Sequence, residues 1–406
     1  MAQKTTLSSA ALPGKTSTFS AKSAAVVAPA TPVPFIFYSP PFVAADYAIW
    51  LATPEGQRIR LLTTSGPQAD VTRLQTRRVI NTPGVAKLTL RNTDYLADIQ
   101  VDSRLIIERR LPSGTAIDTD TFWWVRDWEE VFDQGREFLD VLAYSTLFVL
   151  GGRIVAYASG SSQANQSGYL DDIMKAVVRQ NVGSSATAAR QISDLSVETD
   201  ASAGPQTDGQ AFARKNVLAV LKDLSAEAVK LGTGVYYDID ADFTFRTYAG
   251  QRGQDRSVSS GQPLILSTNN GSLTKVRIST ISADERNYIY AGSGGQGDER
   301  VVATASDADR MAESPYNRRE LWLDARNSTQ AEAAALAQAE LNQMRPREIW
   351  DVDMVDTPAI RYGRDWGFGD RLVAEYKTRQ RDVMVVQTDL LLENGQETIS
   401  GKLEVL

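Results

Sequence analysis

The sequence predicts a β-rich α+β fold, in which small barrels built from separated stretches of chain are interrupted by helical and α/β insertions. Three observations predict it. Short alternating strands fill residues 34–165, helical periodicity replaces them over 166–234, and strand patterns return after 235 around one further helix. At 406 residues the chain is long for a single hydrophobic core. We therefore divide it into an N-terminal arm (1–33), a first β domain with long strands (34–165), a helical insertion (166–234), an α+β segment (235–345) and a C-terminal β-barrel portion (346–406).

The first β domain is predicted from alternation and turn residues. "KLTLRN" (87–92) alternates leucines with polar residues, and "RLIIERRL" (104–111) is predicted to be its partner strand. The stretch 122–157 is rich in aromatic and β-branched residues and is broken at Gly135 and at the Gly151-Gly152 pair. This composition favours long antiparallel strands separated by these glycines.

Three helices are predicted from apolar spacing and end signals. The first follows Ser167 as N-cap and stops at Gly183, the second ends at Gly232, and the third spans 329–344. The predicted core positions of the first two helices are Leu170, Ile173, Met174, Val177 and Val178, and Val217, Leu221, Leu224, Ala228 and Leu231.

The C-terminal portion is predicted to hold four or five strands. Hairpin tips are expected at 377–382 and 393–397, and the second contains Asn394 followed by Gly395, a strong two-residue hairpin pattern. Each hairpin tip is expected to join two antiparallel strands.

The segment "YGRDWGFGDRLVAEY" (362–376) is predicted to lead into this barrel. Its glycines supply bends before the strand "DRLVAEY". We expect Trp366 or Phe368 to plug the end of the barrel, with Leu372 and Ala374 facing its core.

Two absences restrict the chemistry. The chain has no cysteine and no histidine, which excludes thiolate or imidazole zinc sites, cysteine nucleophiles and Ser-His-Asp triads. Only carboxylates, Lys, Tyr, Ser or an oxygen-bound cation remain for catalysis. The net charge of −7 opposes tight non-specific binding of nucleic acid, although it is compatible with DNA sliding past. No run of about 18 apolar residues occurs, so we expect no membrane-spanning segment.

The glycine-rich stretch "AGSGGQGDER" (291–300) is the first candidate for a phosphate cradle. A Walker loop requires Lys and then Ser or Thr, whereas here Asp298 and Glu299 follow the glycines. A dinucleotide fingerprint opens a helix, but "RVVATAS" (300–306) has a strand pattern. The sequence therefore predicts a tight connection between two strands.

Two acidic motifs are likewise given structural interpretations. "DIDAD" (238–242) lacks the glycine and the bidentate glutamate of a calcium-binding EF-hand loop, so we predict a turn between strands. Asp171 and Asp172 could form a catalytic pair, but they fall in a first helical turn, where carboxylates are stabilising.

Further charged groups are candidates for glycoside cleavage or surface ion pairs. The adjacent carboxylates are Glu129 with Glu130, Asp351 with Asp353, and Asp298 with Glu299; the basic doublets are Arg77-Arg78, Arg109-Arg110 and Arg318-Arg319. Adjacency in sequence does not set the separation that glycosidases require, and the doublets are interpreted as salt-bridged surface. We therefore assign no catalytic, cofactor-binding or metal-binding residue, and expect neither a cofactor nor an enzyme.

Several segments, taken in order, resemble a known family. They are "GGRIVAY" (151–157), "DDIMKAVVRQN" (171–181), "RKNVLAVLKDLS" (214–225), "GQDRS" (253–257), "NYIYAGSGGQGDER" (287–300), "RRELWLDAR" (318–326) and "YGRDWGFGDRLVAEY" (362–376). The series resembles the tail-hub family of siphophages and related prophages, which is similar in fold to the baseplate hub of contractile-tailed phages.

The resemblance implies a homotrimer at the distal end of the phage tail in the virion. Two barrel-type tube domains per chain would give six around the axis and match a six-fold tail tube. The implied partners are the distal tail protein, the tape-measure protein and a central fibre or receptor-binding proteins, with DNA passing through the lumen. The alternatives are a carboxylate-dependent hydrolase of cell wall or polysaccharide, and a receptor-binding module. We expect any lytic activity to belong to another subunit.

Two further expectations concern the assembly. Residues 1–33 are of low complexity and poor in core-forming side chains, so we expect this arm to wrap a neighbouring subunit. A bore that lets DNA slide should be lined by neutral or net negative charge, because a basic ring would hold phosphates.

Overall fold

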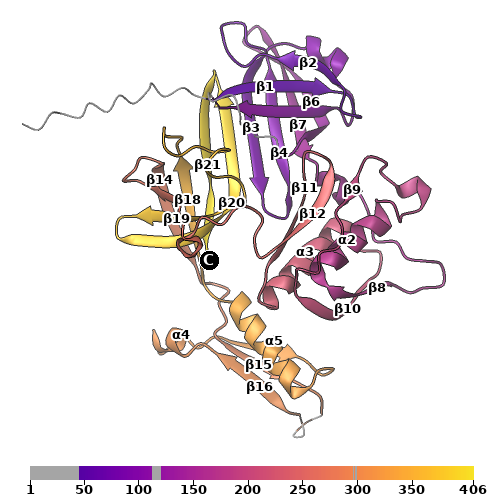
Figure 1. The fold of residues 1–406 in the computed structure, drawn as a ribbon, viewed down its shortest axis with the longest axis vertical. Coiled ribbons are helices and arrows are strands. Elements are labelled where there is room, and N and C mark those ends of the chain that lie inside the picture. Colours follow the sequence, from indigo (N-terminus) through magenta and orange to yellow (C-terminus); the bar gives the residue numbers. More distant parts are fainter. Residues whose placement is uncertain (1–44, 112–119, 296, 298–299) are drawn as a thin grey trace, which may run out of the picture. The chain divides into compact units, whose positions relative to one another are not determined.

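The computed structural model describes residues 45–111, 120–295, 297 and 300–406 (Figure 1). The predicted arm, residues 1–33, lies outside the described residues. The strands are β1 (Asp46–Ala52), β2 (Arg58–Leu62), β3 (Val71–Val79), β4 (Thr82–Leu90), β5 (Arg104–Arg110), β6 (Trp123–Asp133), β7 (Arg136–Ser145), β8 (Ala164–Tyr169), β9 (Ser196–Val197), β10 (Gln206–Phe212), β11 (Val235–Ile239), β12 (Thr244–Ala249), β13 (Ile265–Ser267), β14 (Leu273–Ile281), β15 (Tyr288–Gly292), β16 (Val302–Ser306), β17 (Glu320–Asp324), β18 (Arg347–Met354), β19 (Arg371–Tyr376), β20 (Arg379–Glu393) and β21 (Gln396–Val405). The helices are α1 (Phe148–Gly151), α2 (Leu170–Asn181), α3 (Val217–Lys230), α4 (Ala308–Ala312) and α5 (Gln330–Gln343).

One long sheet dominates the described part of the chain. Its strand order is β14-β18-β21-β20-β3-β4-β7-β6-β5-β1-β2, with β19 and β13 branching from β20. Neighbours along this path are antiparallel, including β20 with β3, where Asp389 lies opposite Arg77. The predicted β-rich α+β class is therefore confirmed. The N-terminal and C-terminal β regions are joined by main-chain hydrogen bonds between β20 and β3.

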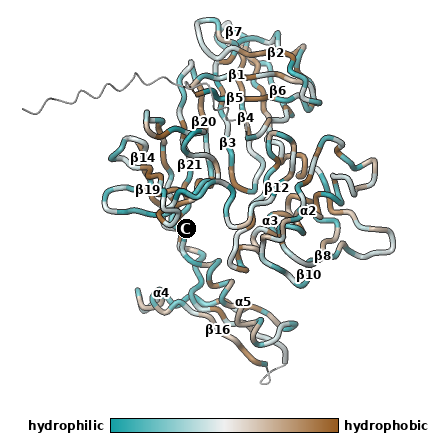
Figure 2. The backbone as a smooth tube through the Cα atoms, in the orientation of Figure 1, coloured by the Kyte–Doolittle hydropathy of each residue, from teal (hydrophilic) through white to brown (hydrophobic). Residues whose placement is uncertain are grey.

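Two hydrophobic cores line the inner side of this sheet. Strands β1 to β7 enclose the first core, which includes Leu88, Leu105 and Val141. Strands β14 and β18 to β21 enclose the second, around Trp350. Strand β20 contributes to both cores. Val385 packs in the second core, and Leu390 and Leu392, which follow a bulge after Val385, pack in the first. Figure 2 shows hydrophobic and hydrophilic stretches along these strands. The face turned away from the two cores is partly covered, because Ile106 on β5 and Trp124 on β6 pack against the core that contains α2 and α3.

Hairpin turns in the long sheet follow local sequence. At the β20–β21 turn Asn394 and Gly395 have φ of 52° and 76°, and at the β6–β7 turn Gly135 has φ of 79°. Both predicted hairpins are confirmed, because these residues tolerate the left-handed backbone that two-residue turns require.

The predicted partner of the strand at 87–92 was wrong. Strand β4 pairs with β3 and β7, whereas β5 pairs with β1 and β6. Strands β3 and β4 are separated by only two residues, and Asn81 at that turn has φ of 55°. The shorter connection closes a tight hairpin and excludes the more distant strand.

A separate core is formed by α2 and α3 together with the small sheet β11-β12-β9. The predicted apolar stripes of both helices are buried, with one exception. Leu231 caps the end of α3 and is 39% exposed. Ser167 is not the N-cap of α2, because it lies in β8, and Tyr169 precedes the first helical residue.

A third, smaller core lies between α5 and the sheet β16-β15-β17. It is built largely from alanines, including Ala291, Ala303, Ala333 and Ala337, which allow the helix to approach the sheet closely. Helix α5 begins at a capping box formed by Thr329 and Glu332. The helix predicted over 329–344 is thus confirmed.

Candidate functional surface

The outer side of the long sheet carries a continuous band of charge, which we call the striped face. Cross-strand register places the charged side chains in four consecutive rows on this side: the charged members of two rows lie on strands from β14 to β3, and those of the other two lie on strands from β20 to β6. Basic residues on β14, β21, β3 and β4 alternate with acidic residues on β18, β20, β7 and β6. The charged members are Lys275, Arg277, Asp351, Asp353, Lys402, Asp389, Glu393, Arg73, Arg77, Lys87, Asp140, Asp127 and Glu129.

Ion pairs connect neighbouring strands across this face. Lys87 Nζ lies 2.8 Å from Asp140, and Arg77 pairs with Asp389. Burial raises the pKa of Asp140, but hydrogen bonds from Lys87 and Thr89 outweigh it and lower the pKa below its ordinary value. The face holds six basic and seven acidic side chains, so its net charge is close to zero and its cations lie beside carboxylates.

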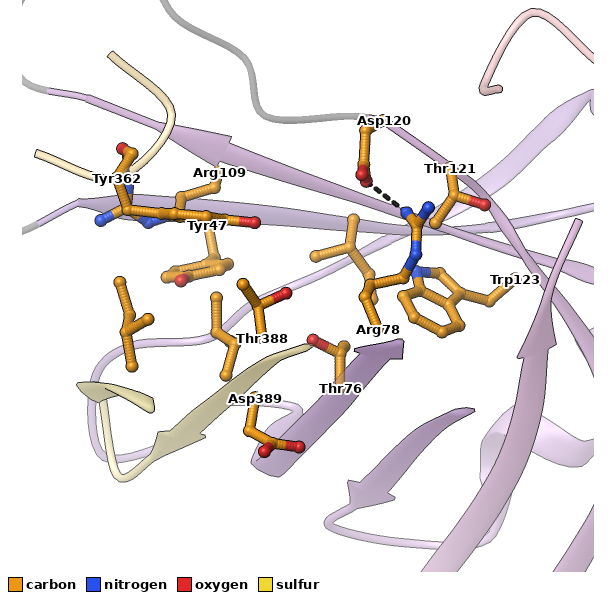
Figure 3. Close-up of a pocket in the computed structure, with 13 residues that line it drawn as sticks. Tyr47, Thr76, Arg78, Arg109, Asp120, Thr121, Trp123, Tyr362, Thr388 and Asp389 are labelled. Carbon is orange, nitrogen blue, oxygen red and sulfur yellow. Dashed lines mark hydrogen bonds and ion pairs between the residues drawn. The ribbon is translucent and has the colours of Figure 1, made fainter. Parts of the chain in front are cut away.

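Arg109, on β5, lies beside Tyr47 and Tyr362 (Figure 3), and its guanidinium joins β5 to two distant segments. Arg109 is 2% exposed. Its Nη2 donates to Glu397 and Asp356 at 2.7 and 2.6 Å, and its Nη1 donates to the Tyr362 carbonyl at 2.7 Å. Burial lowers the pKa of Arg109, but Glu397 outweighs this effect and the pKa rises above its ordinary value. The ion cluster fixes the first β domain to the C-terminal portion.

A second buried cluster surrounds Phe368. The guanidiniums of Arg78 and Arg252 lie 4.9 and 4.7 Å from the centre of its ring, and both arginines pair with Asp238. Arg78 also pairs with Asp120, as Figure 3 shows. Because Arg78 belongs to β3 and Asp238 to β11, the cluster connects the long sheet to the part of the chain formed by α2, α3 and the sheet β11-β12-β9.

The interpretation of the basic doublets as surface was therefore wrong for Arg78 and Arg109. Arg77 and Arg110 are exposed, whereas their neighbours point inward, because successive side chains of a strand face opposite sides. The cavity between the two clusters measures about 40 Å³. It has room for water but not for a substrate.

The adjacent carboxylate pairs are not brought together around a cleft. Glu129 and Glu130 point to opposite sides of β6. Asp351 and Asp353 lie opposite Arg277 and Lys275 on the striped face. The third pair, Asp298 and Glu299, lies outside the described residues.

Asp171 and Asp172 lie in the first turn of α2, as predicted, and bind a neighbouring loop. Asp171 accepts a hydrogen bond from the Gly204 amide, and Asp172 accepts one from the Ala201 amide, both at 2.9 Å. The buried Lys175 ammonium lies 3.1 Å from Asp172 and 3.4 Å from Asp171. The two carboxylates thus hold the loop 199–204 against the helix.

This arrangement predicts an acid-sensitive stability. Burial raises the pKa of Asp172, but hydrogen bonds from Lys175 and Ser202 outweigh it and lower the pKa to about 2. Because the folded-state pKa is depressed, the stabilisation is present above about pH 4 and is lost as the pH falls through about 2. We expect Asp172→Asn to lose less stability between pH 5 and pH 3 than the wild type in urea unfolding. The exposed Asp208→Asn is the control, and an unchanged loss in Asp172→Asn would contradict the assignment.

The glycine-rich stretch connects two strands, as predicted. Strands β15 and β16 are antiparallel, with Gly292 opposite Val302. Arg300 donates to the carbonyls of Gly292 and Ser293 at 2.8 and 3.1 Å and pairs with Asp324. Its guanidinium is therefore engaged in holding the connection.

The acidic motif at 238–242 also forms the predicted turn. Strands β11 and β12 make a hairpin, in which the Phe243 amide donates to the Asp240 carbonyl at 2.9 Å. A hydrogen bond from Arg246 lowers the pKa of Asp242 to about 2. In the part of the chain that the structure describes, no group of three or more acidic side chains is placed to hold a metal ion.

The fold is that of phage tail proteins. The 43 kDa tail protein of prophage MuSo2 from Shewanella oneidensis is similar with a TM-score of 0.57 and 14% identity, covering 89% of this chain and 98% of that one. A tail protein from Neisseria meningitidis has a TM-score of 0.59 and 10% identity, covering 88% and 96%. Prophage tail protein gp18 from Listeria monocytogenes has a TM-score of 0.53 and 11% identity, covering 88% and 94%.

Residues 62–390 match the model of the family described as Siphovirus ReqiPepy6 Gp37-like protein. The chain belongs to this family, and the resemblance to siphophage tail proteins is confirmed. No curated protein matches the chain. Among the described residues, no helix has the length and apolar character needed to cross a membrane.

Proposed function

We propose that this protein is the structural hub of a siphophage tail tip. Three copies close the distal end of the tail tube as a ring, and DNA passes through the ring on infection. The two β-rich cores on one continuous sheet support this role, since three copies would place six such units around the axis. Family membership and the tail-protein fold support it as well.

The main support for this proposal is the striped face, which we propose lines the central channel of the ring. A DNA backbone carries one charge per about 1.7 Å of its axis and is held where several unpaired cations meet it. Neighbouring strands of the striped face lie about 4.8 Å apart, and the sign of the charge changes from one group of strands to the next. Basic side chains lie beside carboxylates. Such a wall offers DNA no cluster of free cations and lets it slide.

The other parts of the chain take roles around this wall. We propose that the ring docks the distal tail protein, the tape-measure protein and a central fibre or receptor-binding proteins, and that the helical segments (166–234) lie at the periphery. The arm (1–33) wraps a neighbouring copy. The chain has no catalytic role in this scheme. In the proposed domain division, residues 34–165 form the first β domain, 235–345 form the α+β segment, and 346–406 form the C-terminal β-barrel portion.

Reversing charge on the striped face should arrest DNA. Asp389→Lys with Glu393→Lys removes the partners of Arg77 and Arg73 and changes the net charge of the face from −1 to +3 per copy. We expect the assembled variant to retain duplex DNA in a mobility assay, with retention that falls steeply as salt rises, whereas the wild type retains none.

The matched control makes the same change of charge elsewhere. Asp208→Lys with Asp284→Lys alters two exposed carboxylates outside the striped face. Equal DNA retention by both variants would show that only net charge matters. DNA retention by the wild type would contradict the proposed sliding wall.

A further inference from the structure

The small sheet β16-β15-β17 has two contrasting faces. Ile289 and Ala291 point towards α5, with which they share a core. The opposite side, here called the aromatic face, carries Tyr288, Tyr290 and Trp322. Tyr290 lies between Thr304 on β16 and Trp322 on β17 in the register of the sheet. Trp322 is 51% exposed, although a residue of this type is usually well buried.

Arginines hold the rings of the aromatic face in place. The Arg318 guanidinium lies 3.9 Å from the centre of the Tyr288 ring and donates to the Tyr290 hydroxyl at 3.0 Å. The two tyrosine rings are 4.7 Å apart, and the Arg300 guanidinium lies 5.1 Å from the centre of the Trp322 ring. Stacked cations of this kind fix the orientation of aromatic side chains, so the face is organised before any ligand arrives.

The cations at this face lie beside carboxylates. Arg318 Nε lies 2.6 Å from Glu320, and Asp324 pairs both with Arg300 and with Arg326, whose Nε is 3.0 Å away. Three guanidiniums thus share two carboxylates, and each has an acidic partner. A polyanion such as DNA requires clustered, unpaired cations, and this surface does not provide them.

The size of the face also restricts its partner. Three strands about 4.8 Å apart and five residues long cover roughly 240 Å². A standard protein–protein interface buries about 800 Å² on each partner. The face by itself therefore matches a small ligand, or a few units of a polymer, better than a folded protein.

We propose that the aromatic face binds an uncharged polysaccharide of the host-cell surface. Pyranose rings have flat C–H faces, which pack on aromatic rings. They also carry hydroxyl groups at their edges, which donate and accept hydrogen bonds. The groups around the rings, namely the Thr304 hydroxyl, the Glu320 carboxylate and the Arg318 guanidinium, match those edges as acceptors and donors. This gives the chain a cell-adhesion activity in addition to its role as a hub.

The test measures binding of the full chain to immobilised neutral oligosaccharides of glucose, galactose and N-acetylglucosamine, with polyuronate and duplex DNA as charged probes. We expect binding to at least one neutral glycan, unchanged between low and high salt. Trp322→Ala should weaken it about tenfold, the loss expected for one aromatic stacking contact. Gly292→Ala should weaken it as well, because a Cβ at this position would lie 2.6 Å from the Trp322 ring.

Tyr316→Ala is the control, because Tyr316 is 89% exposed and is not on this sheet. It should bind like the wild type, and far-ultraviolet circular dichroism should be the same for every variant. Absence of binding to every neutral glycan would overturn the proposal, as would binding that Trp322→Ala leaves unchanged. Salt-sensitive binding to the charged probes alone would identify an anion site instead. If no glycan binds but Trp322→Ala is lost from assembled tails, the face is a protein contact. None of these outcomes depends on the proposed role of the striped face.

Discussion

Arg109→Ala should destabilise the protein by about 3–5 kcal/mol, because it leaves buried carboxylates without their cation. Arg109 is hydrogen-bonded to Glu397, Asp356 and the Tyr362 carbonyl, and its side chain is 2% exposed. The measurement is the free energy of unfolding in urea at neutral pH.

The neighbouring arginine provides the control for this prediction. Arg110 pairs with Glu108, but its side chain is 48% exposed, and Glu108 keeps Arg58 as a second partner. Arg110→Ala should therefore cost about 1 kcal/mol or less. Arg109→Met combined with Glu397→Gln and Asp356→Asn should recover part of the loss. An Arg109→Ala variant within about 1 kcal/mol of the wild type would contradict the structural role of this cluster.

Trp366→Ala should also cost about 3–5 kcal/mol, through the lost aromatic contact and the cavity left behind. Trp366 is 4% exposed and lies in the second core of the long sheet. Its ring packs edge-on against Tyr362, with 4.9 Å between ring centres. A loss of this size approaches the total stability of many domains, so we expect the variant to fail to assemble into tails.

Trp128→Ala tests whether removal of any tryptophan has this effect. Trp128 lies on β6 and is 38% exposed, so its removal should change the free energy of unfolding much less. The two variants are compared by urea unfolding and by their incorporation into assembled tails. Normal incorporation of Trp366→Ala, or equal losses in both variants, would show that the segment 362–376 does not close this core as described.

Much of the fold could be predicted because it is specified by local sequence. Alternation places Leu88 in a core, and Asn394 with Gly395 sets a hairpin turn. Trp366, Phe368, Leu372 and Ala374 are buried as expected. The pairing of β20 with β3 joins segments about 300 residues apart, and no local pattern encodes it. The partner of β4 was missed for a different reason: the pairing is local, but the strand that precedes β4 was not recognised in the sequence.

The burial of Arg78 and Arg109 could be predicted from the sequence only in part. Alternation along a strand predicts that Arg77 and Arg78 point to opposite sides, and this pattern could have indicated that one of them is buried. It could not indicate Asp238 as the partner, which comes from another region of the chain. The striped face likewise depends on the register between distant strands. The charges themselves are visible in the sequence, but their arrangement is not.

A cryo-electron microscopy reconstruction of the assembled tail end would locate both the copies and the bore, and it therefore tests the proposed ring. We predict three copies in a ring, with Arg77, Asp389 and Lys87 of each striped face turned towards a central channel wide enough for duplex DNA. A ring whose striped face points away from the axis, or is covered by another tail protein, would contradict the account.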